Sequence, residues 1–393
     1  MAAFGVPPAP LLIETPAGSV PAPDSSCDDW RLGIPEAHRR PLRRWLWTVA
    51  AVTALVVALG GITRLTRSGL SIVDWDPVMG VVPPLTDQQW ERTFERYRAF
   101  PEYQQLRRGM TLGEFKVIFF WEYVHRLAAR LIGVVFAIPL LFFWVRGYLT
   151  PPLLRRALLL FVLGGAQGLL GWLMVKSGLV DRPSVSHYRL AAHLALAFII
   201  FSYSIWLARD LAAGAGGRTQ DGRLAPILAM VGVLLGVQGI YGALVAGLKA
   251  GLVYNTFPLM AGELAPPTLL VLEPALLNAV QNPVAVQWTH RVLGTVLLAA
   301  VLRLFLVVRR RRLDALSRRL SGVLASLVGA QYLLGVLTLL YLVPVALGVA
   351  HQVLALVICA VWVVWLHHVA AHHGGVHHPV TRGTAARSRS AQA

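Results

Sequence analysis

The sequence predicts an all-α polytopic membrane protein with eight transmembrane helices, arranged as two repeated four-helix bundles. Of its 393 residues, 56% are hydrophobic and only 14% are charged, and the mean hydropathy is +0.60. Several apolar stretches exceed the roughly 18 residues that mark a membrane span. Short motifs also recur in the same order in the two halves of the chain. The spans must be helical, because lipid offers no hydrogen-bond partner to free backbone groups.

Arginine clusters flank the spans on one side only, which the positive-inside rule makes the cytoplasmic side. Both termini are then cytoplasmic, and a bacterial inner membrane is the expected location. This distribution also accounts for the net charge of +17, so we do not expect nucleic acid as a partner. The predicted spans cover about residues 45–66, 118–145, 157–176, 188–208, 225–247, 284–308, 320–342 and 345–366.

Three segments are predicted to lie in the cytoplasm: residues 1–44, 209–224 and 367–393. Residues 1–29 are rich in proline and alanine, which predicts a disordered tail. Their acidic residues argue against a mitochondrial transit peptide, and the first apolar run begins too late for a signal peptide. The tail after residue 366 is rich in histidine and arginine. We expect it to be solvated, with metal binding as the alternative.

The first outer loop, residues 67–117, contains two helix-start signals. Thr86 and Gln89 have the spacing of a capping box, and Trp90 and Phe94 then recur at helical spacing. We therefore expect a short amphipathic helix on the outer membrane surface. A second such box at residues 111–114 predicts the start of the second span.

Internal repetition divides the membrane region into an N-terminal half, residues 45–208, and a C-terminal half, residues 225–366. Gly-Ala-Gln-Gly-Leu-Leu-Gly at 165–171 matches Gly-Ala-Gln-Tyr-Leu-Leu-Gly at 329–335, and residues 68–80 match 250–262. Four spans return the chain to its starting side, so the repeat is parallel.

Four histidines occupy matching places in these spans: His125, His193, His290 and His351. Counting to the first cytoplasmic polar residue places all four rings roughly 24–32 Å from that side, near the outer boundary of a core about 30 Å thick. Histidines in lipid are functional by default, and neutral imidazole is a heme ligand. Hydrogen bonding to a neighbouring helix is the alternative for any one of them. Four matched rings favour two bis-histidine hemes, one in each half.

Three arginines lie beside these histidines: Arg126, Arg189 and Arg291. A guanidinium suits the carboxylates of heme propionates. The alternative is an interfacial anchor, or for Arg126 a salt bridge with Glu122 on the same helix face.

The two halves differ three residues before the first histidine of each, where Glu122 corresponds to Gln287. A carboxylate can ionise and move a proton, whereas an amide cannot. This difference assigns chemistry to the N-terminal half and electron transfer to the C-terminal half, unless Glu122 only pairs with Arg126. Gln167 and Gln331 lie in the glycine-rich repeat motif, and the same Gly-x-Gln-x-x-x-Gly pattern occurs at 236–242. We expect close helix packing with a polar cross-link there, with a cofactor role as the alternative.

Six motifs follow one another along the membrane region: Gly-Gly-Ile-Thr-Arg-Leu-Thr-Arg-Ser-Gly-Leu-Ser at 60–71, Trp-Glu-Tyr-Val-His-Arg at 121–126, Tyr-Arg-Leu-Ala-Ala-His at 188–193, Asn-Thr-Phe-Pro-Leu-Met at 255–260, Gln-Trp-Thr-His-Arg at 287–291 and His-Gln at 351–352. Together, these motifs resemble the heme A synthase family across roughly residues 45–366. The chain has only Cys27 and Cys359, so it is similar to the cysteine-poor branch, found in mitochondria and many proteobacteria.

The resemblance implies an oxidoreductase that converts a peripheral methyl group of heme O to the formyl group of heme A by successive hydroxylations, with water as oxygen source. It implies the substrate heme between His125 and His193, a heme b between His290 and His351, and a central catalytic role for Glu122. Expected partners are heme O synthase, terminal oxidase assembly factors and the lipid bilayer; the electron acceptor and homo-oligomer formation stay open. The alternative is a diheme b-type electron-transfer protein without chemistry on the heme.

Overall fold

The computed structural model describes residues 34–73, 79–180, 183–212, 224–311 and 313–370. Within these ranges every regular element is helical, and eight helices are long and apolar enough to cross a membrane. This confirms the predicted all-α polytopic fold. The eight are α1 (Glu36–Leu65), α4 (Leu112–Val145), α5 (Pro151–Gly178), α6 (His187–Asp210), α7 (Leu224–Gly247), α9 (Pro283–Arg310), α10 (Ala315–Leu340) and α11 (Val345–Ala370).

Several helices extend beyond the apolar stretches that predicted them. α1 begins at Glu36 rather than Trp45, and α4 begins at Leu112 because Thr111 and Glu114 form the expected capping box. Apolar residues mark only the part of a helix that lipid surrounds, whereas its hydrogen bonds continue into water. At the other terminus α11 reaches Ala370, so the first four residues of the expected tail are helical. The expected disordered segment 1–29 and most of the histidine-rich tail lie outside the described residues.

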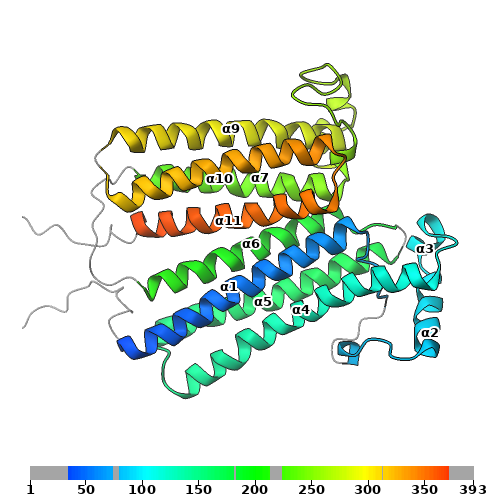
Figure 1. Cartoon of the computed structure of the whole chain (residues 1–393), viewed down its shortest axis with the longest axis horizontal. Helices are drawn as coiled ribbons and strands as arrows, with labels where there is room; N and C mark the ends of the chain where they lie inside the picture. The colour runs from blue at the N-terminus through cyan, green and yellow to red at the C-terminus, as the bar shows by residue number, and fades with distance from the viewer. Residues whose placement is uncertain (1–33, 74–78, 181–182, 213–223, 312, 371–393) are drawn as a thin grey trace, which may run out of the picture.

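The long helices run side by side in two groups, with α1, α4, α5 and α6 in one and α7, α9, α10 and α11 in the other (Figure 1). The groups meet through α1, α6, α7 and α11. α1 packs on α11 and α6 packs on α7. The repeat relates α1 to α7 and α11 to α6, so these two contacts are equivalent. The arrangement fits the two predicted four-helix bundles.

Short elements gather at one end of the bundle (Figure 1). The predicted amphipathic helix is α2 (Asp87–Arg98), with the Thr86 capping box confirmed, followed by α3 (Pro101–Leu106). Phe94 of α2 stacks on Phe115 of α4 with ring centroids 4.9 Å apart, so the first turns of α4 support the outer segment. The corresponding loop of the other group contains η2 (Ala250–Leu252), η3 (Pro267–Leu270), η4 (Ala275–Leu277) and α8 (Asn278–Gln281).

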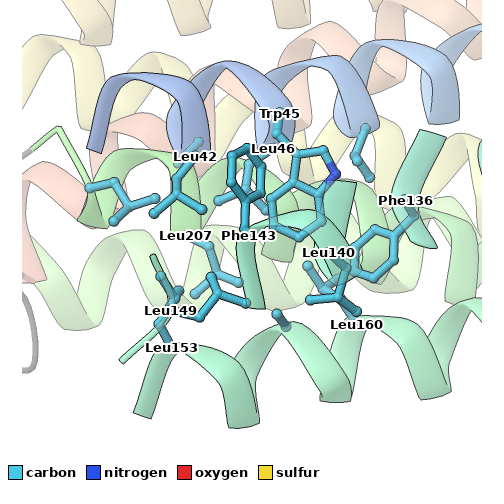
Figure 2. Close-up of a cluster of buried hydrophobic side chains, with 14 of the residues drawn as sticks. Leu42, Trp45, Leu46, Phe136, Leu140, Phe143, Leu149, Leu153, Leu160 and Leu207 are labelled. Atoms are coloured by element: carbon cyan, nitrogen blue, oxygen red, sulfur yellow. The ribbon is translucent and has the colours of Figure 1, made fainter. Parts of the chain in front are cut away.

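Aromatic packing fixes α1 against α4 at the opposite end (Figure 2). The ring centroid of Trp45 lies 5.1 Å from that of Phe136 and 5.6 Å from that of Phe143. The Trp45 indole also donates to the backbone oxygen of Val135 at 3.1 Å. Van der Waals packing and such hydrogen bonds drive helix association in lipid. The contacts of Trp45 therefore fix the register of α1 against α4, including the part farther along both helices.

Buried polar contacts join the two groups of helices. Gln352 of α11 donates to the backbone oxygen of Val57 in α1 at 2.8 Å. Near the other end, His367 Nε2 lies 2.9 Å from Asp210 Oδ1, and Arg156 reaches the second carboxylate oxygen at 3.3 Å. His367 is only 2% exposed, so the expectation of a solvated side chain is wrong at this position. His367 is buried because its neighbours on α11 are apolar and pack in the helix interface.

Candidate functional site

The structure pairs the four predicted histidines within the halves. His125 of α4 and His193 of α6 are close enough for their charges to interact, and so are His290 of α9 and His351 of α11. In each half, the second and fourth helices therefore bring one imidazole each to a shared region, as the sequence predicts.

Each histidine ring rests on a glycine of a neighbouring helix. A Cβ atom built on any of these glycines would fall 2.9–3.3 Å from the Cε1 atom of the ring. Carbon atoms pack favourably only at about 3.5–4.0 Å, so a larger side chain would displace the ring. The pairs are Gly60 with His125, Gly171 with His193, Gly242 with His290, and Gly335 with His351.

The glycine contact also opens a backbone carbonyl to each ring. The carbonyl oxygen of the residue four positions before the glycine lies within hydrogen-bonding reach of the ring. The carbonyl of residue i faces the side chain of residue i+4 on a helix, so a missing Cβ at i+4 gives the ring access. The accepting residues are Val56, Gln167, Gln238 and Gln331.

The Nδ1 atom of each ring is buried and has no hydrogen-bond partner among the described residues. A neutral imidazole that keeps a buried ring nitrogen without a protein partner is able to ligate a metal. Within the described ranges, no three His, Cys, Asp or Glu side chains cluster as a metal site. A pair of protein ligands suits an iron whose remaining ligands come from a porphyrin, so these residues fit two bis-histidine hemes.

Three glutamine side chains make the polar cross-link that the repeat motif predicted, and its target is the histidine itself. The amide of Gln167 donates to the backbone oxygen of His193 at 3.1 Å. The amides of Gln238 and Gln331 do the same to His290 at 3.2 Å and His351 at 2.9 Å. The repeat motif did not indicate this target, and Val56 and Gly60 were not predicted as the matching pair. The recurring Gln-x-x-x-Gly spacing, on the helix next to each of these three histidines, would have indicated the contact.

The carboxylate of Glu122 is 2% exposed and fully hydrogen-bonded. Its Oε2 atom accepts bonds from the Ser71 hydroxyl at 2.6 Å and the Ile72 amide at 2.8 Å. Its Oε1 atom lies 2.6 Å from the guanidinium of Arg126. The helix salt bridge held as the alternative is therefore present, but two further donors also fix the carboxylate in place.

The matching position in the other half is built differently. The Gln287 amide donates to the backbone oxygen of Tyr254 at 2.9 Å. The repeat aligns Val253 with Ser71, so this half has neither the carboxylate nor the hydroxyl. The sequence analysis missed Ser71, although this difference between the repeats would have identified it.

The three predicted arginines tie the histidine-bearing helices to nearby backbone. Arg126 donates to the backbone oxygen of Ile72 at 2.7 Å, and Arg291 donates to the equivalent oxygen of Tyr254 at 2.8 Å. Arg189 reaches the backbone oxygen of Leu173 on α5. These bonds leave the predicted role toward heme propionates untested.

Two further cations occupy repeat-matched positions just beyond α1 and α7. Arg67 and Lys249 both have left-handed backbone conformations, with φ of 53° and 54°. Burial lowers the pKa of Lys249, and the positive charges of Arg67 and Arg64 lower it further. Three cations, Arg64, Arg67 and Lys249, therefore lie near one another at this end of the bundle, and such a group attracts anions.

Comparison with known proteins agrees with this architecture. The COX15-CtaA family model, described as a cytochrome oxidase assembly protein, matches residues 43–363. The chain is 45% identical to the heme A synthase of Sinorhizobium medicae over 327 residues, 83% of this chain and 89% of that protein. It is 44% identical to the heme A synthase of Parvibaculum lavamentivorans over 335 residues, 85% and 96%. It is also 47% identical to that of Rhodospirillum centenum over 324 residues, 82% and 87%.

These relatives span nearly the same length as the chain, and the matched region contains all four histidines and Glu122. By its eight helices and by its similarity along more than four fifths of its length, the chain belongs to the heme A synthase family.

Proposed function

We propose that the N-terminal half, residues 45–208, binds heme O between His125 and His193 and oxidises one of its methyl groups. The C-terminal half, residues 225–366, would hold a resident heme b between His290 and His351. A bound heme b would supply one-electron redox chemistry. The four glycine-supported rings, each with one buried nitrogen left over, support both assignments.

The observation that carries the division of labour is the difference between Glu122 and Gln287. Both side chains are buried at the same place relative to a histidine. Glu122 accepts bonds from Ser71, Ile72 and Arg126, whereas Gln287 only completes the backbone contact with Tyr254. A site that merely held an electron-carrying heme would need no ionisable group, so we assign the reaction to the half with the carboxylate.

The reaction itself defines what Glu122 must do. Converting a methyl group and one water to a formyl group releases four protons and four electrons, in successive two-electron steps. A carboxylate near the reacting carbon stabilises developing positive charge and accepts protons from the attacking water. Ser71 and Arg126 would position the two carboxylate oxygens, one each. The electrons leave to a one-electron acceptor outside the described chain.

We further propose that both termini are cytoplasmic in a bacterial inner membrane. The arginine-rich helix ends lie at the end of the bundle away from α2 and α3 (Figure 1), and the positive-inside rule assigns that end to the cytoplasm. The substrate would come from heme O synthase through the membrane, and the product would pass to terminal oxidase assembly.

Replacing Glu122 with glutamine tests this function. We expect heme b to stay bound and heme A to disappear from the pigment extracted from membranes supplied with heme O. Glu114→Gln is the matched control, because Glu114 caps the same helix at its exposed end. Normal heme A output from Glu122→Gln would refute the catalytic assignment.

The same extraction separates the enzyme from a diheme electron carrier. The enzyme yields heme A when heme O is supplied, whereas a carrier yields only heme b. Membership of the heme A synthase family favours the enzyme.

A further inference from the structure

One of the four histidine supports differs from the other three. Gln167, Gln238 and Gln331 each lie four residues before a supporting glycine and donate an amide bond to the histidine backbone. At the equivalent place before Gly60 the residue is Val56. It offers the His125 ring its backbone carbonyl, as the glutamines do for their rings, but it has no amide to donate.

The glutamine bond acts as a clamp between two helices. It joins the helix that supplies the glycine to the backbone of the histidine on the next helix. It therefore fixes the depth and rotation of the ligand in addition to the tilt of its ring. Both histidines of the C-terminal half are clamped in this way, by Gln238 and Gln331. In the N-terminal half, only His193 is clamped, by Gln167.

Helix packing shows a second difference on the same side. α4, which carries His125, contacts its neighbour α5 far less than α9 contacts α10, although the repeat makes these pairs equivalent. α4 is thus held mainly by α1 in the membrane region, where Thr63 donates to the backbone oxygen of Trp121 at 3.1 Å. Among the described residues, however, no side chain of α1 bonds the backbone of His125, and α4 lacks the close packing on α5 that α9 has on α10.

We propose that Val56 makes His125 the releasable ligand of the N-terminal site, so that this site exchanges its heme while the C-terminal site retains its own. The inference rests on the proposed function, in which one heme is a substrate that must leave as product and the other stays. A missing clamp lowers the cost of moving α4 away from the bound heme. The two complete clamps of the other half resist the same movement.

Restoring the missing clamp tests the proposal. In Val56→Gln, the new side chain has the register of the three natural glutamines and can reach the backbone of His125. We expect heme A or heme O to leave the purified protein roughly 3- to 20-fold more slowly, the range that one hydrogen bond between membrane helices provides. The measurement is transfer of heme to an excess of apomyoglobin, with each heme identified by its pyridine hemochrome spectrum. Val56→Leu adds similar bulk without an amide and should behave as the wild type.

The reverse changes, Gln238→Val and Gln331→Val, should make heme b leave faster by a similar factor. The thermal unfolding of each variant without heme shows whether the fold is intact. Unchanged N-terminal heme release in a folded Val56→Gln, or equal slowing by Val56→Leu, would overturn the proposal, and so would unchanged heme b release in both glutamine variants. Failure of the proposed function looks different, because the wild type would then bind no heme that depends on His125.

Discussion

The glycine supports predict a graded series of heme-binding defects in the C-terminal half. An alanine Cβ at residue 335 would fall 2.9 Å from Cε1 of His351, whereas one at residue 242 would fall 3.3 Å from Cε1 of His290. At Gly329, also on α10, no described atom outside the helix backbone lies within 4 Å of the added Cβ. The three substitutions are chemically identical, so only the contact distance differs.

The displacement follows from ordinary packing distances. With carbon contacts of about 3.5 Å or more, the His351 ring must move by at least about 0.6 Å in Gly335→Ala, and the His290 ring by about 0.2 Å in Gly242→Ala. Ligand sites tolerate misplacement of about 0.5 Å. Altered support of a metal-binding histidine costs about 10- to 100-fold in affinity, or about 1.4–2.7 kcal/mol. Gly335→Ala should reach this range, Gly242→Ala should cost less, and Gly329→Ala should cost nothing.

The assay is the ratio of heme b to protein after purification, with thermal unfolding measured in parallel. Alanine favours a helix over glycine by about 0.5–1 kcal/mol, so none of the variants should lose its fold through backbone preference. Full heme b occupancy and an unchanged spectrum in Gly335→Ala would refute the support role of the glycine. A loss of heme in Gly329→Ala equal to that in Gly335→Ala would show that the effect does not depend on the ring contact.

Three further outcomes are expected. His290→Ala should remove the heme b spectrum, as measured by pyridine hemochrome on purified protein. Asp210→Ala should lower the free energy of unfolding by about 1–3 kcal/mol, because it leaves the buried ring of His367 without its hydrogen-bond partner; Asp314→Ala removes a more exposed carboxylate and should change thermal unfolding less. Burial raises the pKa of Glu102 in α3. The segment formed by α2 and α3 is therefore stabilised while this carboxyl is protonated, and it loses that stabilisation as the pH rises through the raised pKa. Glu102→Gln should remove this pH dependence, as measured by the protection of the segment from protease.

The helices and the four histidines could be predicted from the sequence because lipid imposes a strong constraint. Spans must be apolar and helical, so any polar residue that recurs at matched places stands out. The helix ends were less predictable. α4 begins at Leu112, six residues before the apolar span, and only the capping box of Thr111 marked this start; α11 continues past His367 with no such signal. Hydropathy predicts the part of a helix that lies in lipid, whereas capping residues and helix packing determine where the helix begins and ends.

The supports of the histidines were visible only in part. Gln167 and Gln331 were recognised as packing residues, but their target depends on which helices are neighbours, and this is set in three dimensions. Gly60 opens the motif at residues 60–71, but nothing marked it as a histidine support, because Val56 stands where the other three supports have a glutamine. Ser71 lies in a loop whose contact with Glu122 spans 51 residues of sequence, so only the comparison of the two repeats could have identified it.

The packing of α1 links the two proposed sites. Gly60 admits the ring of His125 on one side, and Gly61 admits Gln352 on another, where an added Cβ would lie 3.0 Å from the amide oxygen. The backbone carbonyls one turn earlier, those of Val56 and Val57, accept the ring bond and the Gln352 bond respectively. Since Gln352 follows His351 directly, His125 and His351 are both held against adjacent peptide groups of one helix. A displacement of α1 therefore reaches both proposed sites, although each lies in its own group of helices.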